Sequence, residues 1–269
     1  MVRIIDGKRI AGMIKDELKT EVQELKKQGT EVCLAVIQVG KDPASTAYIG
    51  IESLAYELEE DISQAELLKL IQELNSKETV HGILVQLPLP KHIDEQAVIQ
   101  EISPEKDVDG FHPINVGNLC LGTKGFVSCT PAGIIQLLKR SNIAIEGKEC
   151  VIVGRSNIVG KPMALLMLRE NATVTVAHSR TKNLSEITKK ADILIVAIGQ
   201  KKFITSEYVK AGAVVIDVGM HRNENKKLCG DVDFDSVIEK AEAITPVPGG
   251  VGPMTIAMLM NNCVEAVKG

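Results

Sequence analysis

Short apolar runs rich in valine and isoleucine alternate along this chain with segments of helical periodicity. The runs lie at 32–40, 82–89, 150–153, 173–178, 193–198, 214–218 and 243–247, and the clearest helical segments at 8–29, 65–74, 131–140 and 255–267. Apolar residues recur at three- and four-residue steps in the first helical segment. A run that is apolar on both faces is typical of a parallel strand covered by helices. The alternation therefore predicts an α/β fold built from βαβ units.

A stretch rich in glycine, proline and aspartate at 103–125 interrupts this rhythm. We therefore predict two α/β domains. The first comprises 1–125 together with a returning C-terminal helix at 254–269. The second comprises 126–253 and is a Rossmann-like parallel-sheet domain for a dinucleotide. An active-site cleft between the two domains is part of the prediction.

The composition excludes several classes of protein. Residues that are 45% hydrophobic and 25% charged are ordinary for a chain with a sizeable core, and a net charge of -4 gives no reason to expect nucleic acid or an anionic membrane as partner. Six cysteines without C-x-x-C spacing indicate neither a metal site nor a disulfide framework. The start, MVRIIDGKRI, lacks the apolar region of a signal peptide, and no long apolar run predicts a membrane span. We expect a cytoplasmic protein.

The sharpest local feature is VIVGRSNIVGKP at 151–162, where an apolar run leads into Gly154 and Pro162 can occupy the first position of a helix. Backbone N–H groups at such a helix N-terminus are expected to face a phosphate. Ser156, however, replaces the central glycine of G-x-G-x-x-G, and the next glycine is Gly160. An ordinary strand–turn–helix corner therefore remains an alternative.

The following apolar run ends in His178-Ser179-Arg180, without the acidic residue that usually binds the ribose of NAD at this place. Arg155 lies in the preceding turn. A cationic pocket with a hydroxyl group suits a 2′-phosphate, so the pattern favours NADP over NAD. The alternative is that Arg155 and Arg180 are solvated surface charges.

Three further segments combine polar groups with stiff backbone. VQLPLP at 85–90 places Gln86 at the carboxyl end of a buried strand, where α/β proteins bind ligands. KDVDG at 106–110 offers two carboxylates, although Asp-Gly is also ordinary turn chemistry. TPVPGGVGPMT at 245–255 is rich enough in glycine and proline to let a flat ligand approach the backbone, or it is a plain connector.

Taken together, six motifs resemble the bifunctional methylenetetrahydrofolate dehydrogenase/methenyltetrahydrofolate cyclohydrolase family. They are VGKDPAS (39–45), GILVQLPLP (82–90), KDVDGFHPIN (106–115), CTPAGI (129–134), GRSNIVGKP (154–162) and TPVPGGVGPMT (245–255). They occur in the order of that family and cover nearly the whole chain. The resemblance implies that a hydride passes from the methylene carbon to NADP⁺ and that water then opens the methenyl cation to 10-formyltetrahydrofolate. It also implies a homodimer formed through the cofactor domain.

The site residues of that family fall on definite positions of this sequence. By the resemblance, the catalytic residues are Tyr48, Gln86 and Asp109, and the cofactor contacts are Gly154, Arg155, Ser156, Ser179 and Met220. The substrate contacts are Tyr48, Val85, Gln86, Leu87, Asp109, Pro248, Gly249, Gly250, Val251, Gly252, Pro253, Met254 and Thr255. These roles fit the side chains, because Asp109 can accept hydrogen bonds from pterin N–H groups and Tyr48 can stack on a flat ring.

The resemblance fails at one position. The central catalytic residue of the family is a lysine four residues after the tyrosine, but here that position is Glu52, and no Lys or Arg occurs between Lys41 and Lys69. Either a helical segment between Tyr48 and Glu52 is merely missing from the recorded chain, or it is deleted. Cyclohydrolase chemistry needs proton transfer by a group titrating near neutral pH. A real deletion therefore predicts lost cyclohydrolase and badly impaired dehydrogenase activity.

Two other functions remain open. A chain without the lysine is consistent with a catalytically impaired protein that binds folate and NADP. An amino-acid or shikimate-type dehydrogenase has a similar two-domain plan, although the VQLPLP and PGGVGPMT segments argue against it.

Overall fold

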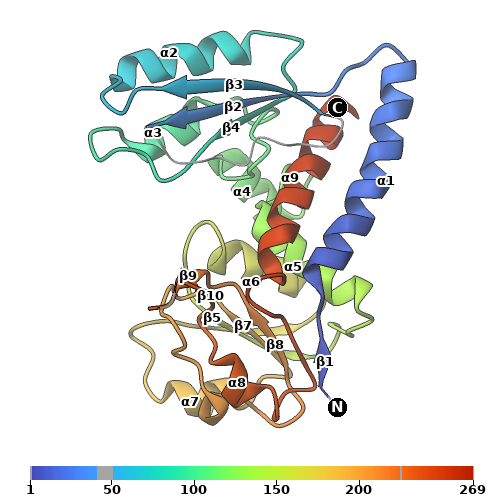
Figure 1. Cartoon of the computed structure of the whole chain (residues 1–269), viewed down its shortest axis with the longest axis vertical. Helices are drawn as coiled ribbons and strands as arrows, with labels where there is room; N and C mark the ends of the chain where they lie inside the picture. Colours follow the sequence, from blue (N-terminus) through green and yellow to red (C-terminus); the bar gives the residue numbers. More distant parts are fainter. Residues whose placement is uncertain (1, 41–50, 225, 269) are drawn as a thin grey trace. The chain divides into compact units, whose positions relative to one another are not determined.

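The computed structural model describes residues 2–40, 51–224 and 226–268 and confirms the predicted α/β class. The chain divides into two compact units, Met1–Gly12 with Cys129–Met258 and Met13–Ser128 with Leu259–Gly269. We call the first the six-stranded unit and the second the three-stranded unit, after their sheets. Two helices, α1 (Gly7–Lys27) and α9 (Val251–Lys268), begin in the six-stranded unit and end in the three-stranded unit (Figure 1).

The three-stranded unit contains a parallel sheet in the order β3-β2-β4. Its elements are β2 (Cys33–Val39), β3 (Glu52–Leu58), α2 (Gln64–Asn75), β4 (Gly82–Val85), α3 (Glu95–Glu101) and α4 (Pro113–Leu121). Alternate residues of β2 and β4 bury their side chains in one cluster with Leu67, Ile71 and Leu74 of α2 and Val98 of α3. One face of the sheet is thus covered by α2 and α3. In such sheets, ligands bind beyond the carboxyl ends of the strands.

The six-stranded unit contains a parallel sheet in the order β1-β11-β8-β7-β5-β6. Its strands are β1 (Arg3–Ile4), β5 (Glu149–Val153), β6 (Thr173–Ala177), β7 (Ile193–Val196), β8 (Val214–Asp217) and β11 (Ala243–Ile244). A separate antiparallel pair is formed by β9 (His221–Arg222) and β10 (Leu228–Cys229). The helices are α5 (Cys129–Arg140), α6 (Gly160–Arg169), α7 (Leu184–Thr188) and α8 (Phe234–Val237), with a 3-10 turn, η1, at Ser206–Tyr208.

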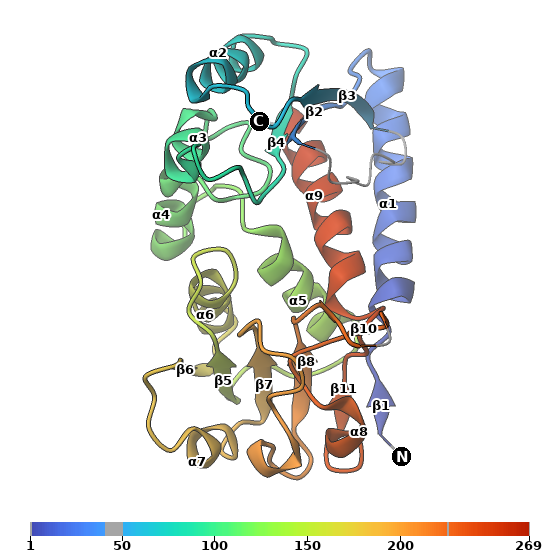
Figure 2. The same cartoon turned by 60° about the vertical axis from the view of Figure 1, so that its left-hand side comes forward.

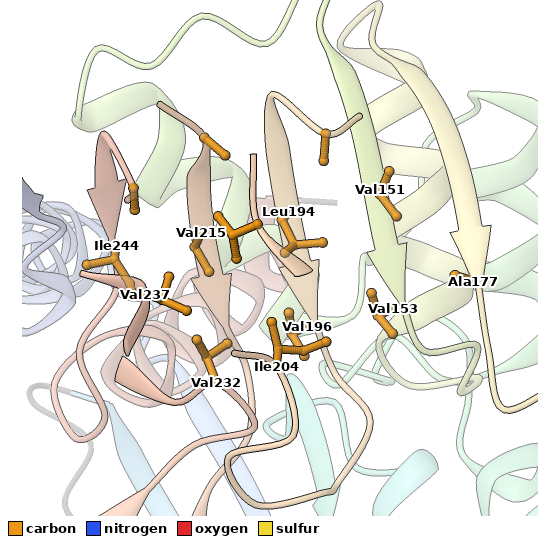
Figure 3. Packing of buried hydrophobic residues seen from close by; sticks show 14 residues of the cluster. Val151, Val153, Ala177, Leu194, Val196, Ile204, Val215, Val232, Val237 and Ile244 are labelled. Carbon is orange, nitrogen blue, oxygen red and sulfur yellow. The ribbon is translucent and has the colours of Figure 1, made fainter. Parts of the chain in front are cut away.

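Aliphatic side chains from five neighbouring strands form the core on one face of this sheet. Figure 3 shows them packing with Ile204, Val232 and Val237 from the segments beyond the strands. Helix α6 packs against β5 and β6, next to α5 (Figure 2). The central strands β7, β8 and β11 and most of β5 are buried on both faces, which is the physical reason for their apolar sequences, whereas the edge strands β1 and β6 are largely exposed.

Several predicted boundaries are wrong, for example at β7 and β11, which end at Val196 and Ile244, and three others concern segments of the predicted sites. The strand predicted at 82–89 ends at Val85, because Pro88 and Pro90 lack the N–H that a strand ladder requires. The helix after the glycine turn begins at Gly160, two residues before Pro162. The last helix begins at Val251 rather than at 255, and Pro253 is tolerated there because the first N–H groups of a helix have no partner within it.

The two units differ from the predicted domains at residues 1–12, 126–128 and 254–258. Residues 1–12 join the six-stranded unit because β1 pairs with β11, Arg3 opposite Ala243. Met254 packs against Gly133 so closely that a Cβ on this glycine would lie 2.7 Å from the Met254 Cβ. The end of α9 does return to the three-stranded unit, where the Asn262 side chain donates to Val108 O at 2.8 Å.

Candidate functional site

A pocket of about 290 Å³ lies at the carboxyl ends of β5, β6 and β7. It is lined by Val153, Gly154, Arg155, Ser156, His178, Ser179, Leu184, Ala197, Ile198, Gln200 and Phe203. The structure therefore brings four of the predicted cofactor residues, Gly154, Arg155, Ser156 and Ser179, into one concave surface. The fifth, Met220, is 65% exposed and does not line this pocket.

Gly154 and Gly160 make the turn possible through backbone contacts. Gly154 has φ +130°, and a Cβ there would lie 2.2 Å from the Ala197 carbonyl oxygen. A Cβ on Gly160 would lie 2.4 Å from the Gly154 carbonyl oxygen. The spacing of these two glycines thus reflects close packing of the turn against its own helix and against the loop after β7.

Ser156 closes the turn from within. Its Oγ accepts hydrogen bonds from the N–H groups of Val159 at 3.1 Å and Gly160 at 3.3 Å. The Lys161 N–H donates to the Ser156 carbonyl oxygen at 3.0 Å. Ser156 Oγ thus accepts two N–H groups at the start of α6 from within the chain, and the expectation that this turn faces a phosphate stays a prediction.

Two exposed cations flank the pocket. The side chains of Arg155 and Arg180 have no ion-pair partner among the residues that the structure describes. A tight turn after β6 presents Ser179, since the His178 N–H donates to Thr181 Oγ1 at 2.8 Å and the Arg180 N–H donates to His178 Nδ1 at 3.2 Å. An unpaired guanidinium beside an exposed hydroxyl group can bind a phosphate.

In the three-stranded unit, Gln86 follows β4 directly and is exposed. Its backbone N–H still donates to the Ile37 carbonyl oxygen at 2.9 Å, which fixes the first residue beyond the strand. Val85, Leu87 and Asp109 line one small cavity of about 10 Å³ together with Asp107 and Phe111. The predicted residues around Gln86 and the predicted Asp109 are therefore neighbours within this unit.

Asp109 lies between Asp107, which is hydrogen-bonded, and Gly110, which packs against the backbone of Ser128. A Cβ on Gly110 would lie 2.6 Å from the Ser128 backbone nitrogen, so this position excludes side chains. Burial, together with the nearby Asp107 carboxylate, raises the pKa of Asp109 to about 7. Asp107 is buried and accepts hydrogen bonds from the His112 N–H at 2.8 Å and the Asn115 side chain at 2.9 Å. Asp109 can thus exchange a proton near neutral pH.

The predicted contacts at 248–255 divide between a turn and a helix. Pro248 follows a cis peptide bond, and Gly249 has φ +102°. Its carbonyl oxygen accepts a hydrogen bond from the Lys8 N–H at 2.9 Å. Val251, Gly252, Pro253, Met254 and Thr255 form the beginning of α9, where the Thr255 hydroxyl lies 2.8 Å from that of Thr130.

Tyr48 lies outside the described residues, whereas Glu52, which stands at the position of the family lysine, is the exposed first residue of β3. Ala197, Ile198 and Gln200 line the cofactor pocket but were not among the predicted site residues, although they lie just after the end of β7. Ligands bind at this edge of an open parallel sheet, so the residues that follow the apolar run of β7 could have been predicted as part of the site. Within 2–40, 51–224 and 226–268, no group of His, Cys, Asp or Glu has the arrangement of a metal site, and no helix is long and apolar enough to cross a membrane.

Two family models match the chain. The model described as tetrahydrofolate dehydrogenase/cyclohydrolase, catalytic domain, matches residues 5–109. The model described as tetrahydrofolate dehydrogenase/cyclohydrolase, NAD(P)-binding domain, matches residues 128–269. The second match contains the whole cofactor pocket.

The chain is 70% identical to the Bifunctional protein FolD of Lachnoclostridium phytofermentans, covering 100% of this chain and 99% of that protein. The FolD crystal structure from Campylobacter jejuni is 53% identical with a TM-score of 0.96, covering 100% of this chain and 99% of that one. The Trypanosoma brucei structure, which contains NADP and an inhibitor, is 39% identical with a TM-score of 0.93, covering 99% and 97%. A shikimate dehydrogenase from Thermus thermophilus shares the fold alone, at 14% identity and a TM-score of 0.53.

The alignment with the Lachnoclostridium protein spans 278 positions against the 269 residues of this chain, so the relative has at least nine residues without a counterpart here. A surplus of this size is consistent with the helical segment that the family resemblance implies between Tyr48 and Glu52 and that this chain lacks. Since both family models match in order and together span most of its length, the chain belongs to the tetrahydrofolate dehydrogenase/cyclohydrolase family.

Proposed function

We propose that this chain oxidises 5,10-methylenetetrahydrofolate to 5,10-methenyltetrahydrofolate with NADP⁺ and hydrolyses the product to 10-formyltetrahydrofolate. The observation that carries the proposal is the match of both family domains, catalytic and NAD(P)-binding, on one chain that is 70% identical to a bifunctional FolD protein. The match favours this enzyme over a shikimate-type dehydrogenase, with which only the fold is shared.

The residues of the cofactor pocket support NADP as the dinucleotide. Arg155 and Ser179 supply a cation and a hydroxyl group at the ends of β5 and β6, where an NAD enzyme usually carries a carboxylate. The Trypanosoma relative binds NADP in its crystal structure. When bound, NADP⁺ supplies the acceptor for the hydride. The chain itself contributes the phosphate contact and the glycine turn, which lets the dinucleotide approach the backbone.

In the substrate site, Asp109 is the group whose chemistry the structure defines best. Its pKa of about 7 means that protonated and ionised forms coexist near neutral pH. The ionised form accepts hydrogen bonds from pterin N–H groups, and the protonated form can also donate. Gln86 contributes an amide that can donate or accept beside the folate, and Tyr48 a ring that can stack on it.

The two steps make different demands on these residues. In the first, the C–H bond of the methylene carbon breaks and its electron pair leaves as hydride, so the residues need only align the two reactants. In the second, water adds to the methenyl carbon and releases one proton. The second proton then passes to one ring nitrogen as its C–N bond breaks and the formyl C=O forms. That step needs a group that moves protons near neutral pH.

The lysine that the family resemblance implies for this role is absent from the sequence. The Lachnoclostridium relative has at least nine residues without a counterpart in this chain. This observation favours the alternative of an impaired protein that binds folate and NADP. The family match favours the active enzyme over that alternative. We therefore expect the dehydrogenase and cyclohydrolase steps to be affected unequally.

We also infer a homodimer formed through the six-stranded unit. β6 is the last strand of its sheet and pairs only with β5 among the described residues. Leu168 is 61% exposed and Val176 is 39% exposed on α6 and β6. An edge strand with apolar neighbours suits pairing with a second copy. Val176→Lys should shift the mass measured by light scattering from dimer to monomer.

A cytoplasmic location is part of the same proposal. All six cysteines are free thiols. Several free thiols and no disulfide among them are typical of a reducing compartment. Fractionation of the native host, with the chain detected by antibody, would test this location.

The decisive experiment is an assay of the purified 269-residue protein, its intact mass verified. Formation of NADPH from 5,10-methylenetetrahydrofolate measures the first step, and loss of the methenyl absorbance without NADP⁺ measures the second. NADPH formation that requires the folate supports the proposal. Tight binding of NADPH and folate without turnover would instead support the impaired alternative.

A further inference from the structure

Asp231 has a fully buried carboxylate, and one of its two oxygens binds backbone N–H groups of the loop after β7. Its Oδ2 accepts the backbone N–H groups of Ile198 at 2.7 Å and Gly199 at 3.0 Å. Its Oδ1 lies 2.7 Å from His221 Nε2. With the carboxylate of Asp231 ionised, His221 Nε2 is the donor of this contact. Three donors thus fix one buried side chain.

The loop that Asp231 holds is one wall of the cofactor pocket. Ile198 and its neighbours Ala197 and Gln200 line the pocket together with Gly154 and Arg155. The Ala197 carbonyl oxygen is also the atom that a Cβ on Gly154 would approach to 2.2 Å. A shift of this loop therefore changes the space available beside the glycine turn.

Backbone hydrogen bonds also join the segment after β7 to the segment around Asp231, in addition to the contacts of the Asp231 side chain. The Ile204 N–H donates to the Asp231 carbonyl oxygen at 3.0 Å, and the Lys202 N–H donates to Gly230 O at 3.0 Å. Asp217, at the end of β8, is buried as well and accepts the Asp231 N–H at 2.9 Å. Burial, with a smaller contribution from the Asp231 carboxylate, raises the pKa of Asp217 to about 6. Asp231 is therefore bound from both sides.

We propose that Asp231 is a positioning residue for the dinucleotide, which through Ile198 and Gly199 holds the loop after β7 in the shape that binds the cofactor. His221 orients the carboxylate from the β9 side. The inference rests on the proposed function only in naming the ligand as NADP. Charge-assisted hydrogen bonds to backbone N–H groups are strong and directional, which suits them to fix a loop that has no regular structure.

A purely structural role makes a different prediction. If Asp231 only stabilised the fold, its removal would lower the melting temperature and leave the affinity of the folded fraction for NADPH unchanged. A positioning role instead raises the KM for NADP⁺ and the Kd for NADPH, with little change in kcat. The two roles therefore separate in a binding titration of folded protein.

The test compares Asp231→Ala with Asp231→Asn and with Asp192→Asn as matched control. Asp192 is also a hydrogen-bonded aspartate next to β7, but it lies at the amino end of the strand, where it accepts the Glu149 N–H at 3.1 Å and pairs with Lys210. NADPH binding is followed by fluorescence titration, and backbone amide exchange is measured in the cofactor-free protein. Asp231→Asn keeps an acceptor oxygen, so it should retain part of the affinity.

Asp231→Ala should weaken NADPH binding roughly tenfold, as expected for the loss of charge-assisted hydrogen bonds, and should speed amide exchange at Ile198 and Gly199. Asp192→Asn should do neither. Wild-type affinity with protected amides in folded Asp231→Ala would overturn the inference. If this variant does not fold, His221→Phe replaces it, and unchanged NADPH affinity there has the same meaning. The wild-type titration tests the proposed cofactor by itself, whereas the amide exchange tests the role of Asp231 without any ligand.

Discussion

Gly154 and Ala197 lie so close that a Cβ on the glycine would be 2.2 Å from the alanine carbonyl oxygen. The contact joins the turn after β5 to the loop after β7, and both segments line the cofactor pocket. The pocket thus depends on the absence of a side chain at one position.

Gly154→Ala should therefore destabilise the six-stranded unit by about 2–5 kcal/mol, since it adds a clash to a positive-φ strain. Dinucleotide binding should fall with it. Chemical denaturation and an NADPH titration measure the two effects. Gly12→Ala is the control, because a Cβ there meets nothing within 4 Å. Equal stability of the two variants would show that the turn relaxes around the new side chain.

Arg155→Ala should lower the preference for NADP over NAD by roughly tenfold or more, because a charge-assisted contact to the 2′-phosphate is lost while NAD has no such group. The measurement is kcat/KM with each dinucleotide. Arg169→Ala, an exposed arginine in the last turn of α6, is the control. Unchanged selectivity in Arg155→Ala would mean that the phosphate pocket is assigned to the wrong residue.

Asp109 should make the protein less stable as the pH rises. Its pKa is about 7 in the folded protein and has an ordinary value of 3.8, so the folded state binds more protons in between, and the free energy of unfolding falls from about pH 4 to about pH 7. Asp217, with a raised pKa of about 6, acts in the same direction. Asp109→Asn should flatten this decline, and the exposed Asp16→Asn should not. Urea titrations at several pH values measure the free energy of unfolding. If it depends on pH equally in Asp109→Asn and in the wild type, the raised pKa of Asp109 is contradicted.

The segment after Tyr48 should decide the cyclohydrolase rate. Replacing residues 41–58 by the corresponding segment of the Lachnoclostridium relative should raise this rate about 100-fold or more, the usual contribution of a positioned acid–base group. The control carries the same replacement with its lysines changed to methionine. Equal rates in the two chimeras would show that the relative's segment acts through packing and not through a proton-transferring lysine.

Lys106 should stabilise the three-stranded unit by capping α2. Its Nζ donates to the carbonyl oxygens of Leu74, Asn75 and Lys77 at 3.2, 2.8 and 2.7 Å. Lys106→Met should cost about 1–3 kcal/mol, since carbonyl groups at the negative end of the helix dipole, two of them part-buried, lose their partner. Denaturant unfolding measures the change against Lys69→Met, an exposed lysine of α2. A loss no larger than that of the control would contradict the capping role.

The strands and the longest helices were predictable because their signals are local. The first helix was expected at 8–29 and is found at Gly7–Lys27, with Ile10, Ile14, Leu18 and Val22 buried at the predicted spacing. The short helix α4 was not predicted, since it lies in the glycine- and proline-rich stretch 103–125 and begins with Pro113 after a His112 cap. A capped proline start is a weak pattern when the apolar stripe is short.

The sequence by itself determined the fold class, the glycine turn and the family, because burial on both faces of a parallel strand and steric demands on glycine leave a mark on neighbouring residues. Only the tertiary structure decided that β1 pairs with β11 and that the Asp231 carboxylate binds N–H groups of the loop after β7. These contacts join groups whose partners depend on how the chain folds back, and hydrogen bonding of a buried carboxylate has no period along the sequence. Gly154 belongs to both groups. Its presence was read from the sequence, and its closeness to Ala197 was not.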